Sequence, residues 1–280
     1  MQDGRRSLGY YLLAGFFGLY VLFLYGPTLT IAVLSFQGPD GGLTFPMNGM
    51  SLHWFRNLFA RQAVGDFGGS LRRSLALGAI VMGLTVTFSV AAGLAFRRRF
   101  RGATLLFTLA VASLIVPSIL VSLGIGLLFN LLGFEPAWYS SALGAHLTWT
   151  LPFGLLIMLA VFNRFNPFYE EAARDLGATS WQCFRHVVLP IIAPSVIGIA
   201  LFGFTLSYDE FARTLMTAGS FNTLPLEIYG MTTNITTPVL YALGTLTTVF
   251  SFLVIGTSLG AVLLLRRRRA RLGNDAGKGV

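Results

Sequence analysis

The sequence is poor in charged residues and has almost no lysine or cysteine. Asp, Glu, Lys and Arg together make up 11% of its 280 residues, Lys278 is the only lysine, and Cys183 is the only cysteine. A single cysteine excludes an intrachain disulfide and a cysteine-based metal cluster. With its only lysine at 278, the chain cannot contain a G-x-x-x-x-G-K-[ST] phosphate-binding loop. If the protein takes part in an ATP-driven process, we expect another subunit to bind the ATP.

Apolar residues dominate what is present. They make up 54% of the chain, and the mean hydropathy is +0.70. This leaves too little polar material to cover a soluble globule of this size. The formal net charge is +9, but the arginines are clustered between apolar runs and not spread over one soluble face. The composition therefore predicts a polytopic membrane protein, whose fold class we expect to be all-α, with no role in binding nucleic acid.

Six apolar stretches are long enough to cross a bilayer, which takes about twenty residues. We read the chain as one domain, 1–280, in which the first stretch is a retained span and not a cleaved signal peptide. The third stretch is overlong and contains Pro117, which we expect to kink the helix and to face the interior of the bundle, where its freed carbonyl can be satisfied. Neighbouring Ser113, Ser118 and Ser122 either line a polar path or pack helices together. The predicted spans are 10–36, 75–96, 103–132, 142–162, 191–208 and 238–265.

One long polar interruption, 163–190, is strongly patterned. Asn166 can cap a helix whose first residue is Pro167, and Gly177 can end it in the left-handed conformation. Thr179 and Gln182 have the spacing of a capping box for a second helix, which we expect to continue until Pro190. The stretch predicts helix, glycine turn, helix.

An apolar stripe is expected on the first of these helices, because Phe168, Ala172 and Leu176 recur at a spacing of four and Ala173 widens the face. Helices of about ten residues are marginal alone in water, so we expect packing to stabilise the pair.

The polar stretch resembles the EAA loop of the membrane subunits of bacterial binding-protein-dependent type I ABC importers. The resemblance is carried by Glu171-Ala172-Ala173, Asp175-Leu176-Gly177-Ala178 and Val188-Leu189-Pro190. It implies that the loop inserts a short coupling helix into a cleft of an ATPase subunit, a helix-in-groove contact, and that the apolar stripe fixes the loop to its own spans. The residues implicated in coupling are Glu170, Glu171, Ala172, Ala173, Asp175, Gly177, Ala178 and Pro190.

The resemblance also implies the partners and the compartment. They are a second homologous permease subunit, two ATPase subunits that bind ATP and Mg, and a periplasmic or lipid-anchored substrate-binding protein. The chain itself is then a permease of the bacterial inner membrane, with no catalytic residue, no metal site and no cofactor. We call the segment 163–190 the coupling stretch. If both termini are cytoplasmic, all but five of the 20 basic residues lie on the same side of the membrane as this stretch, as the positive-inside rule favours. The exceptions are Arg56, Arg61, Arg72, Arg73 and Arg213.

Two carboxylates, Asp209 and Glu210, directly follow the fifth predicted span. Eighteen residues of helix rise roughly 27 Å, so both acids are expected near the outer membrane face and not at deep buried positions. Arg213 has the spacing of a helical ion pair with either acid, which makes the acids an anchor for the segment. Alternatively, they attract a cationic substrate.

Ser207-Tyr208-Asp209-Glu210-Phe211 and Thr217-Ala218-Gly219 resemble the spermidine/putrescine branch of these permeases. The resemblance implies polyamine uptake, while an opine, an amino acid or a phosphonate stays an alternative substrate. Candidate residues of the substrate path are Tyr208, Asp209, Glu210, Pro117 and Ser118.

An ion-coupled secondary transporter is the alternative from a different class. Such proteins tend to have inverted repeats and ionisable groups at the middle of the membrane. Apart from tyrosines, His146 is the only ionisable acid or base within the predicted spans, and no repeat is evident. His146 can serve as a proton relay or as a hydrogen-bonded contact between helices, and without a nearby carboxylate we favour the contact.

Overall fold

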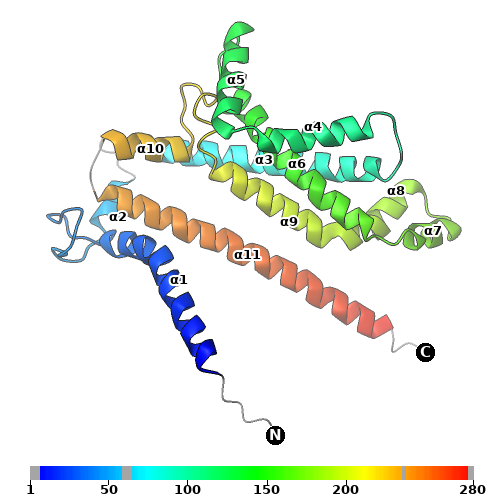
Figure 1. The fold of residues 1–280 in the computed structure, drawn as a ribbon, viewed down its shortest axis with the longest axis horizontal. Helices are drawn as coiled ribbons and strands as arrows, with labels where there is room; N and C mark the ends of the chain where they lie inside the picture. Colours follow the sequence, from blue (N-terminus) through cyan, green and yellow to red (C-terminus); the bar gives the residue numbers. More distant parts are fainter. Residues whose placement is uncertain (1–6, 59–64, 235–237, 277–280) are drawn as a thin grey trace. The chain divides into compact units, whose positions relative to one another are not determined.

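The computed structural model describes residues 7–58, 65–234 and 238–276 of the chain (Figure 1). Within these ranges the protein is all-α, with no strand beyond an isolated bridge between Gln37 and Met50. The predicted fold class is confirmed. Four of the basic residues used in the orientation argument lie outside the described residues: Arg5, Arg6, Arg61 and Lys278.

The helices follow the predicted order of spans. They are α1 (Leu8–Leu34), α2 (His53–Asn57), α3 (Phe67–Phe96), α4 (Ala103–Ile115), α5 (Ser118–Leu131), α6 (Ser141–Asn163), α7 (Phe168–Asp175), α8 (Ser180–Cys183), a π-helix (Phe184–Val188), α9 (Leu189–Tyr208), α10 (Leu224–Asn234) and α11 (Val239–Ala276).

Five helical segments in the described part of the chain are long and apolar enough to cross a membrane, and the number rises to six if α4 and α5 together form one span. The five are Leu8–Leu34, Phe67–Phe96, Ser141–Asn163, Ser180–Tyr208 and Val239–Thr257. They cover the predicted spans apart from the third.

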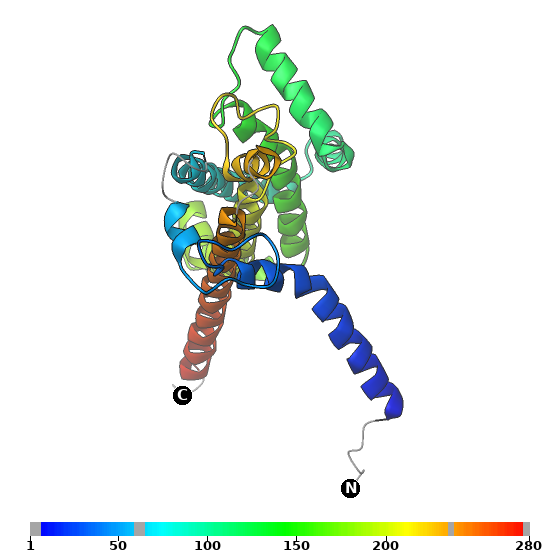
Figure 2. The ribbon, with the colours of Figure 1, turned by 90° about the vertical axis from the view of Figure 1, so that its left-hand side faces the viewer.

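The third predicted span is broken. α4 and α5 are bent by 108° at Val116 and Pro117, which leave the helical conformation, and both views show the two helices running in different directions (Figures 1 and 2). Proline cannot donate the hydrogen bond that would continue α4, and it restricts the residue before it to extended backbone. The prediction that Pro117 faces the bundle interior is wrong for this chain, because Pro117 is exposed at the break.

The helix that begins at Ser180 does not end at Pro190, and that part of the prediction is also wrong. α8, the π-helix and α9 form one continuous segment from Ser180 to Tyr208. The N–H of Leu189 bonds to the carbonyl of Phe184, five residues back, and Pro190 follows within the first turn of α9, where its missing N–H is tolerated. The loop is therefore joined to the fifth span without a hinge.

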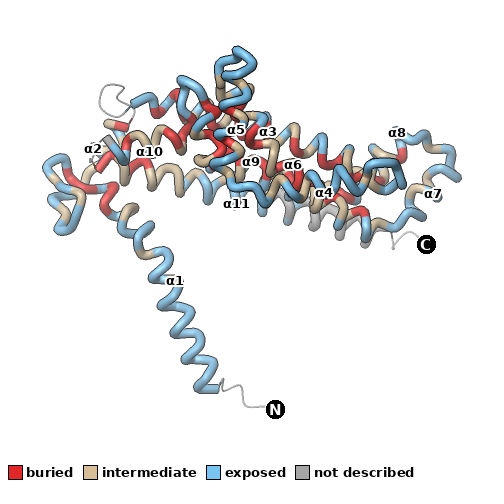
Figure 3. The backbone as a smooth tube through the Cα atoms, turned by 45° about the horizontal axis from the view of Figure 1, so that its top comes forward, coloured by how far each residue is buried: buried red, intermediate tan, exposed pale blue. Residues whose placement is uncertain are grey.

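The chain divides into two compact units. The larger unit, Gly68–Glu227 with Val254–Val280, contains the coupling stretch and the segment after α9. Within it α6 contacts α4, α5 and α9. Gly154 of α6 allows close approach of α3, since a Cβ at this position would lie 2.0 Å from Ser89 Oγ. The buried residues of this unit cluster along α6 and α9 (Figure 3).

The smaller unit, Met1–Phe67 with Ile228–Leu253, contains α1, α2 and the first part of α11. α1 is apolar on all sides and almost wholly exposed, as expected for a helix surrounded by lipid or by another subunit. The loop after α1 is organised by Gln37, whose Oε1 accepts from Asn48 N at 2.8 Å. Tyr241 of α11 donates to Leu43 O of this loop at 2.7 Å.

Candidate functional site

The predicted helix-turn-helix forms within 163–190, but α7 begins at Phe168, one residue later than predicted, with Pro167 at its N-cap. Asn166 Oδ1 accepts from Phe168 N at 3.0 Å at the start of α7. Gly177 ends the helix with φ +86°, a conformation that L side chains rarely adopt. Thr179 and Gln182 form the complete capping box at the start of α8.

An ion pair attaches α7 to the end of α3. Both terminal nitrogens of the Arg97 guanidinium, Nη1 and Nη2, donate to Glu170, with the Nη1–Oε1 distance at 3.0 Å. The hydrogen bonds from Arg97 lower the pKa of Glu170 below its usual value, despite partial desolvation. Arg97 also lies over the rings of Phe162 and Phe165, each centroid 5.2 Å away. Glu170 thus anchors α7 to the end of α3.

The apolar stripe of α7 faces outward, contrary to the prediction that it fixes the loop to the spans. Leu176 is 90% exposed and Phe168 is 68% exposed, and Ala172 between them is exposed as well. Figure 3 shows α7 as largely exposed. Only Ala173 of the predicted face packs against the buried cluster that includes Cys183 and Val188. The outward stripe is therefore available to a second protein.

The other coupling candidates differ in their surroundings. Glu171 and Asp175 are exposed, and neither forms an ion pair among the described residues. Ala178 is half-buried, and its N–H bonds to Ala173 O at 3.0 Å across the glycine turn. α7 thus presents two free carboxylates beside its exposed apolar stripe.

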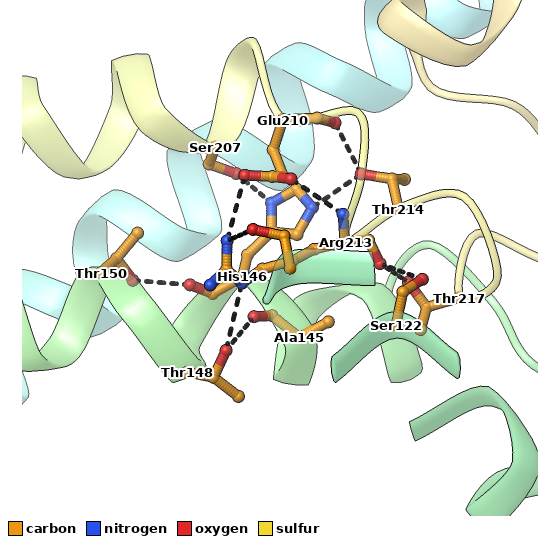
Figure 4. Close-up of polar contacts among 11 residues, drawn as sticks. Ser122, Ala145, His146, Thr148, Thr150, Ser207, Glu210, Arg213, Thr214 and Thr217 are labelled. Atoms are coloured by element: carbon orange, nitrogen blue, oxygen red, sulfur yellow. Dashed lines mark hydrogen bonds and ion pairs between the residues drawn. The ribbon is translucent and has the colours of Figure 1, made fainter. Parts of the chain in front are cut away.

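A second polar cluster surrounds Arg213 in the segment after α9 (Figure 4). Arg213 and Glu210 are both buried, with Nη1 3.5 Å from Oε2, and the other carboxylate oxygen accepts from Arg213 N at 2.8 Å. The predicted ion pair is confirmed, but it forms in a turn and not in a helix. The position of both acids near the outer membrane face stays a prediction, and Glu210 is buried within the protein.

Other helices of the same unit supply further partners for Arg213. Nη1 donates to Ser118 Oγ at 2.8 Å, Nε donates to Thr148 Oγ1 at 3.4 Å, and the guanidinium lies 4.5 Å from the ring centroid of Trp149. Ser122 donates to Arg213 O at 2.9 Å. Arg213 therefore holds the segment after α9 against α5 and α6.

His146 belongs to the same cluster and has a defined tautomer. Thr214 donates its hydroxyl proton to Glu210 O at 2.7 Å, so it must accept from His146 Nε2 at 3.0 Å. Nδ1 is then the acceptor for the Ser207 hydroxyl at 2.8 Å. His146 is a fully buried, hydrogen-bonded contact between α6 and the segment after α9, as favoured from the sequence.

The five substrate-path candidates do not form one site. Glu210 and Ser118 both bind Arg213, Tyr208 is buried with its ring stacked on Phe204, and Pro117 lies at the helix break. Asp209 is exposed and forms no ion pair among the described residues. Local spacing indicated the Glu210–Arg213 contact, but nothing in it pointed to Trp149 or Thr148.

Groups of three or more His, Cys, Asp or Glu side chains able to hold a metal ion are absent from the described residues. The chemistry of both clusters is that of hydrogen bonding, charge and apolar contact.

Comparison with known proteins places this arrangement in a family. Residues 83–271 match the family described as binding-protein-dependent transport system inner membrane component. The chain is 27% identical to the spermidine/putrescine transport system permease protein PotC of Shigella flexneri over 270 residues, covering 96% of this chain and 99% of that protein. It is 28% identical to the putrescine transport system permease protein PotI of Escherichia coli K12, covering 80% of this chain and 81% of that protein.

Solved structures show the same fold. A chain of a bacterial ABC transporter involved in the import of the acidic polysaccharide alginate aligns with a TM-score of 0.67 at 16% identity, covering 93% of this chain and 95% of that one. The alginate transporter in complex with an alginate pentasaccharide-bound periplasmic protein aligns with a TM-score of 0.62 at 17% identity, covering 95% and 94%. The chain belongs to the family of binding-protein-dependent transport system inner membrane components, and it is a permease subunit of an ABC importer, not the ATPase.

Proposed function

We propose that this permease carries polyamines such as spermidine and putrescine into the cell. The observation that carries the proposal is the similarity to PotC and PotI over 80 to 96% of the chain. Asp209 supports it, because an exposed carboxylate at the end of α9 suits a cationic substrate. Glu210 has no such role, since its charge is used by Arg213 inside the protein.

The coupling residues have separate roles in the proposed mechanism. Glu170 fixes α7 to Arg97, and Gly177 provides the turn into α8. Glu171, Asp175 and the outward apolar stripe then face the cleft of an ATPase subunit. Because α8 continues through the π-helix into α9, a push on the loop is carried directly into the fifth span. The contact with the ATPase also depends on four smaller or rigid residues of the loop: Ala172, Ala173, Ala178 and Pro190.

The proposed assembly contains a second permease, two ATPase subunits that bind ATP and Mg, and a substrate-binding protein. The solved alginate transporter includes a periplasmic protein of this kind, which supports the proposal by analogy of fold. In this proposal both termini and the coupling loop lie in the cytoplasm, which would put most basic residues on that side, as the positive-inside rule favours.

Uptake of radiolabelled spermidine by the complete importer tests the substrate. We expect Asp209→Asn to lower uptake by up to about fivefold, because one exposed charge contact is worth at most about 1 kcal/mol. Glu135→Gln is the matched control, since Glu135 is an exposed acid in the loop between α5 and α6, which the proposed topology places on the same side. Equal uptake by wild type and Asp209→Asn would remove Asp209 from the path.

Competition identifies the solute itself. Unlabelled spermidine and putrescine should displace the label, while an opine, a neutral amino acid and a phosphonate should not. Displacement by one of the latter compounds alone would replace the polyamine proposal with that substrate class.

A further inference from the structure

A cavity of about 520 Å³ lies where the end of α3 meets α7 and α8. Its lining combines two kinds of side chain. The guanidinium groups of Arg97, Arg98 and Arg174 supply the polar part, and Leu94, Ala95 and Phe184 supply an apolar part. All of these residues belong to the larger compact unit.

The charges facing this cavity do not balance. Glu170 is the only carboxylate in its lining, and that carboxylate is already bound by Arg97. Arg98 and Arg174 are exposed, and neither makes an ion pair or a side-chain hydrogen bond among the described residues, although the charge of Arg174 also helps to lower the pKa of Glu170. Two arginines from different elements therefore line one cavity with unused donors, and guanidinium groups are well suited to binding phosphate.

The cavity also lies at the end of an apolar helix that is long enough to cross a membrane. Leu94 and Ala95 are in the last turn of the apolar helix α3, and the next apolar helix begins at Ala103. A ligand whose charged group meets Arg98 and Arg174 would place its neighbouring atoms on Leu94, Ala95 and Phe184. Basic pockets beside membrane-spanning helices on the cytoplasmic side are suited to anionic lipid headgroups.

We propose that this cavity binds the phosphate of an anionic phospholipid, with Arg98 and Arg174 on the phosphate and the apolar wall on the glycerol and first methylene groups. The proposal rests on the cytoplasmic placement of the coupling loop. An acidic peptide of the ATPase is a poorer fit, because the apolar wall continues the membrane-spanning helix while the free face of α7 lies at Phe168 and Leu176. Since Arg174 belongs to α7, the bound lipid would strengthen the attachment of the coupling helix to α3.

Binding of short-chain phosphatidylglycerol to the purified importer complex tests the site. We expect Arg98→Gln/Arg174→Gln to weaken this binding about tenfold or more, since both charge-assisted contacts to the phosphate are lost. The matched control is Arg99→Gln/Arg101→Gln, which removes the same charge from exposed neighbours that do not line the cavity. The control should change the dissociation constant less than about twofold.

Two further binding measurements distinguish a lipid phosphate from free phosphate. Inorganic phosphate should bind much more weakly than phosphatidylglycerol, and Ala95→Trp, which fills the apolar wall without altering charge, should weaken phosphatidylglycerol alone. The lipid site would be overturned if both double variants lost phosphatidylglycerol binding equally. It would also be overturned if inorganic phosphate bound as tightly as phosphatidylglycerol. Loss of ATPase association without loss of lipid binding in Arg98→Gln/Arg174→Gln would assign the cavity to the ATPase instead. Spermidine uptake is measured separately, so failure of the lipid site leaves the transport proposal to its own test.

Discussion

The ion pair between Glu210 and Arg213 is the charge contact on which packing around α6 depends. Both side chains are buried, and the arginine is shared among α5, α6 and the segment after α9. Removing one member of a buried pair leaves an uncompensated charge, whereas replacing both with apolar groups is often nearly neutral.

Glu210→Ala should therefore lower the free energy of unfolding by about 3–5 kcal/mol. Equilibrium unfolding in mixed detergent micelles measures this change. Asp209→Ala, at the adjacent exposed position, should alter stability by no more than about 0.5 kcal/mol. The double variant Glu210→Leu/Arg213→Met should recover much of the loss, and a double variant as unstable as the single one would argue against the pair.

The Glu170–Arg97 pair gives a pH dependence with a defined sign. Its hydrogen bonds lower the pKa of Glu170 from its ordinary value of 4.5, so the folded state binds this proton less readily than the unfolded state. The pair's contribution is complete above pH 4.5 and is lost as the pH falls through the lowered pKa.

At neutral pH, Glu170→Gln should lower stability by at most about 1 kcal/mol, because the pair is partly exposed. Unfolding midpoints of wild type and variant should converge as the pH falls below 4.5. A difference that persists or grows in acid would contradict this sign.

The turn between α7 and α8 depends on the backbone conformation of Gly177 and not on the room available for a side chain at this position. Gly177 has φ +86°, and nothing lies within 4 Å of a Cβ built at this position. A β-branched side chain would add about 1–2 kcal/mol of backbone strain, while asparagine tolerates the left-handed conformation.

Gly177→Val should leave membrane insertion intact and reduce substrate-stimulated ATP hydrolysis by the assembled importer. Gly177→Asn, the conservative variant, should retain most of the stimulation. If both variants hydrolyse ATP at the wild-type rate, the turn does not transmit motion.

The exposed apolar stripe of α7 gives a prediction about association with the ATPase. Leu176→Ser should weaken association with the ATPase by about tenfold, as loss of a well-buried apolar anchor costs about 1–2 kcal/mol. It should not destabilise the permease, because Leu176 is 90% exposed in this chain. Pull-down of the ATPase and thermal unfolding of the permease distinguish the two effects.

Local sequence signals predicted where helices begin and end better than they predicted which residues each helix contacts. Asn166, Gly177 and the Thr179–Gln182 box act over a few residues, and each forms as expected. The orientation of α7 could not be predicted, because a periodic stripe does not indicate whether it faces its own chain or a partner. Its direction depends on Arg97, which is 73 residues from Glu170.

The same reasoning applies to the helix break and to the continuous fifth span. Pro117 predicted a kink, but the bend of 108° depends on the packing of α5 against α6 and on the segment after α9. Pro190 was expected to end a helix, and a single π-turn before it preserves the helix. Such long-range contacts and local changes of helical pitch leave no periodic signal in the sequence.

At the scale of the whole molecule, the chain is a membrane component that needs partners. Its exposed apolar helices require lipid or a second permease, and its coupling stretch presents an apolar stripe with two free carboxylates. In the proposed mechanism the chain supplies a path and a mechanical connection, while the energy comes from the ATPase.

Accessibility of one engineered cysteine tests this account most directly. Leu176→Cys places a reactive thiol on the outward stripe of α7, and the single native cysteine, Cys183, is buried and contributes little background. A membrane-impermeant thiol reagent should label the introduced thiol only from the cytoplasmic side, and the bound ATPase should protect it. Labelling from outside intact cells, or labelling that the ATPase does not reduce, would contradict the proposed coupling loop.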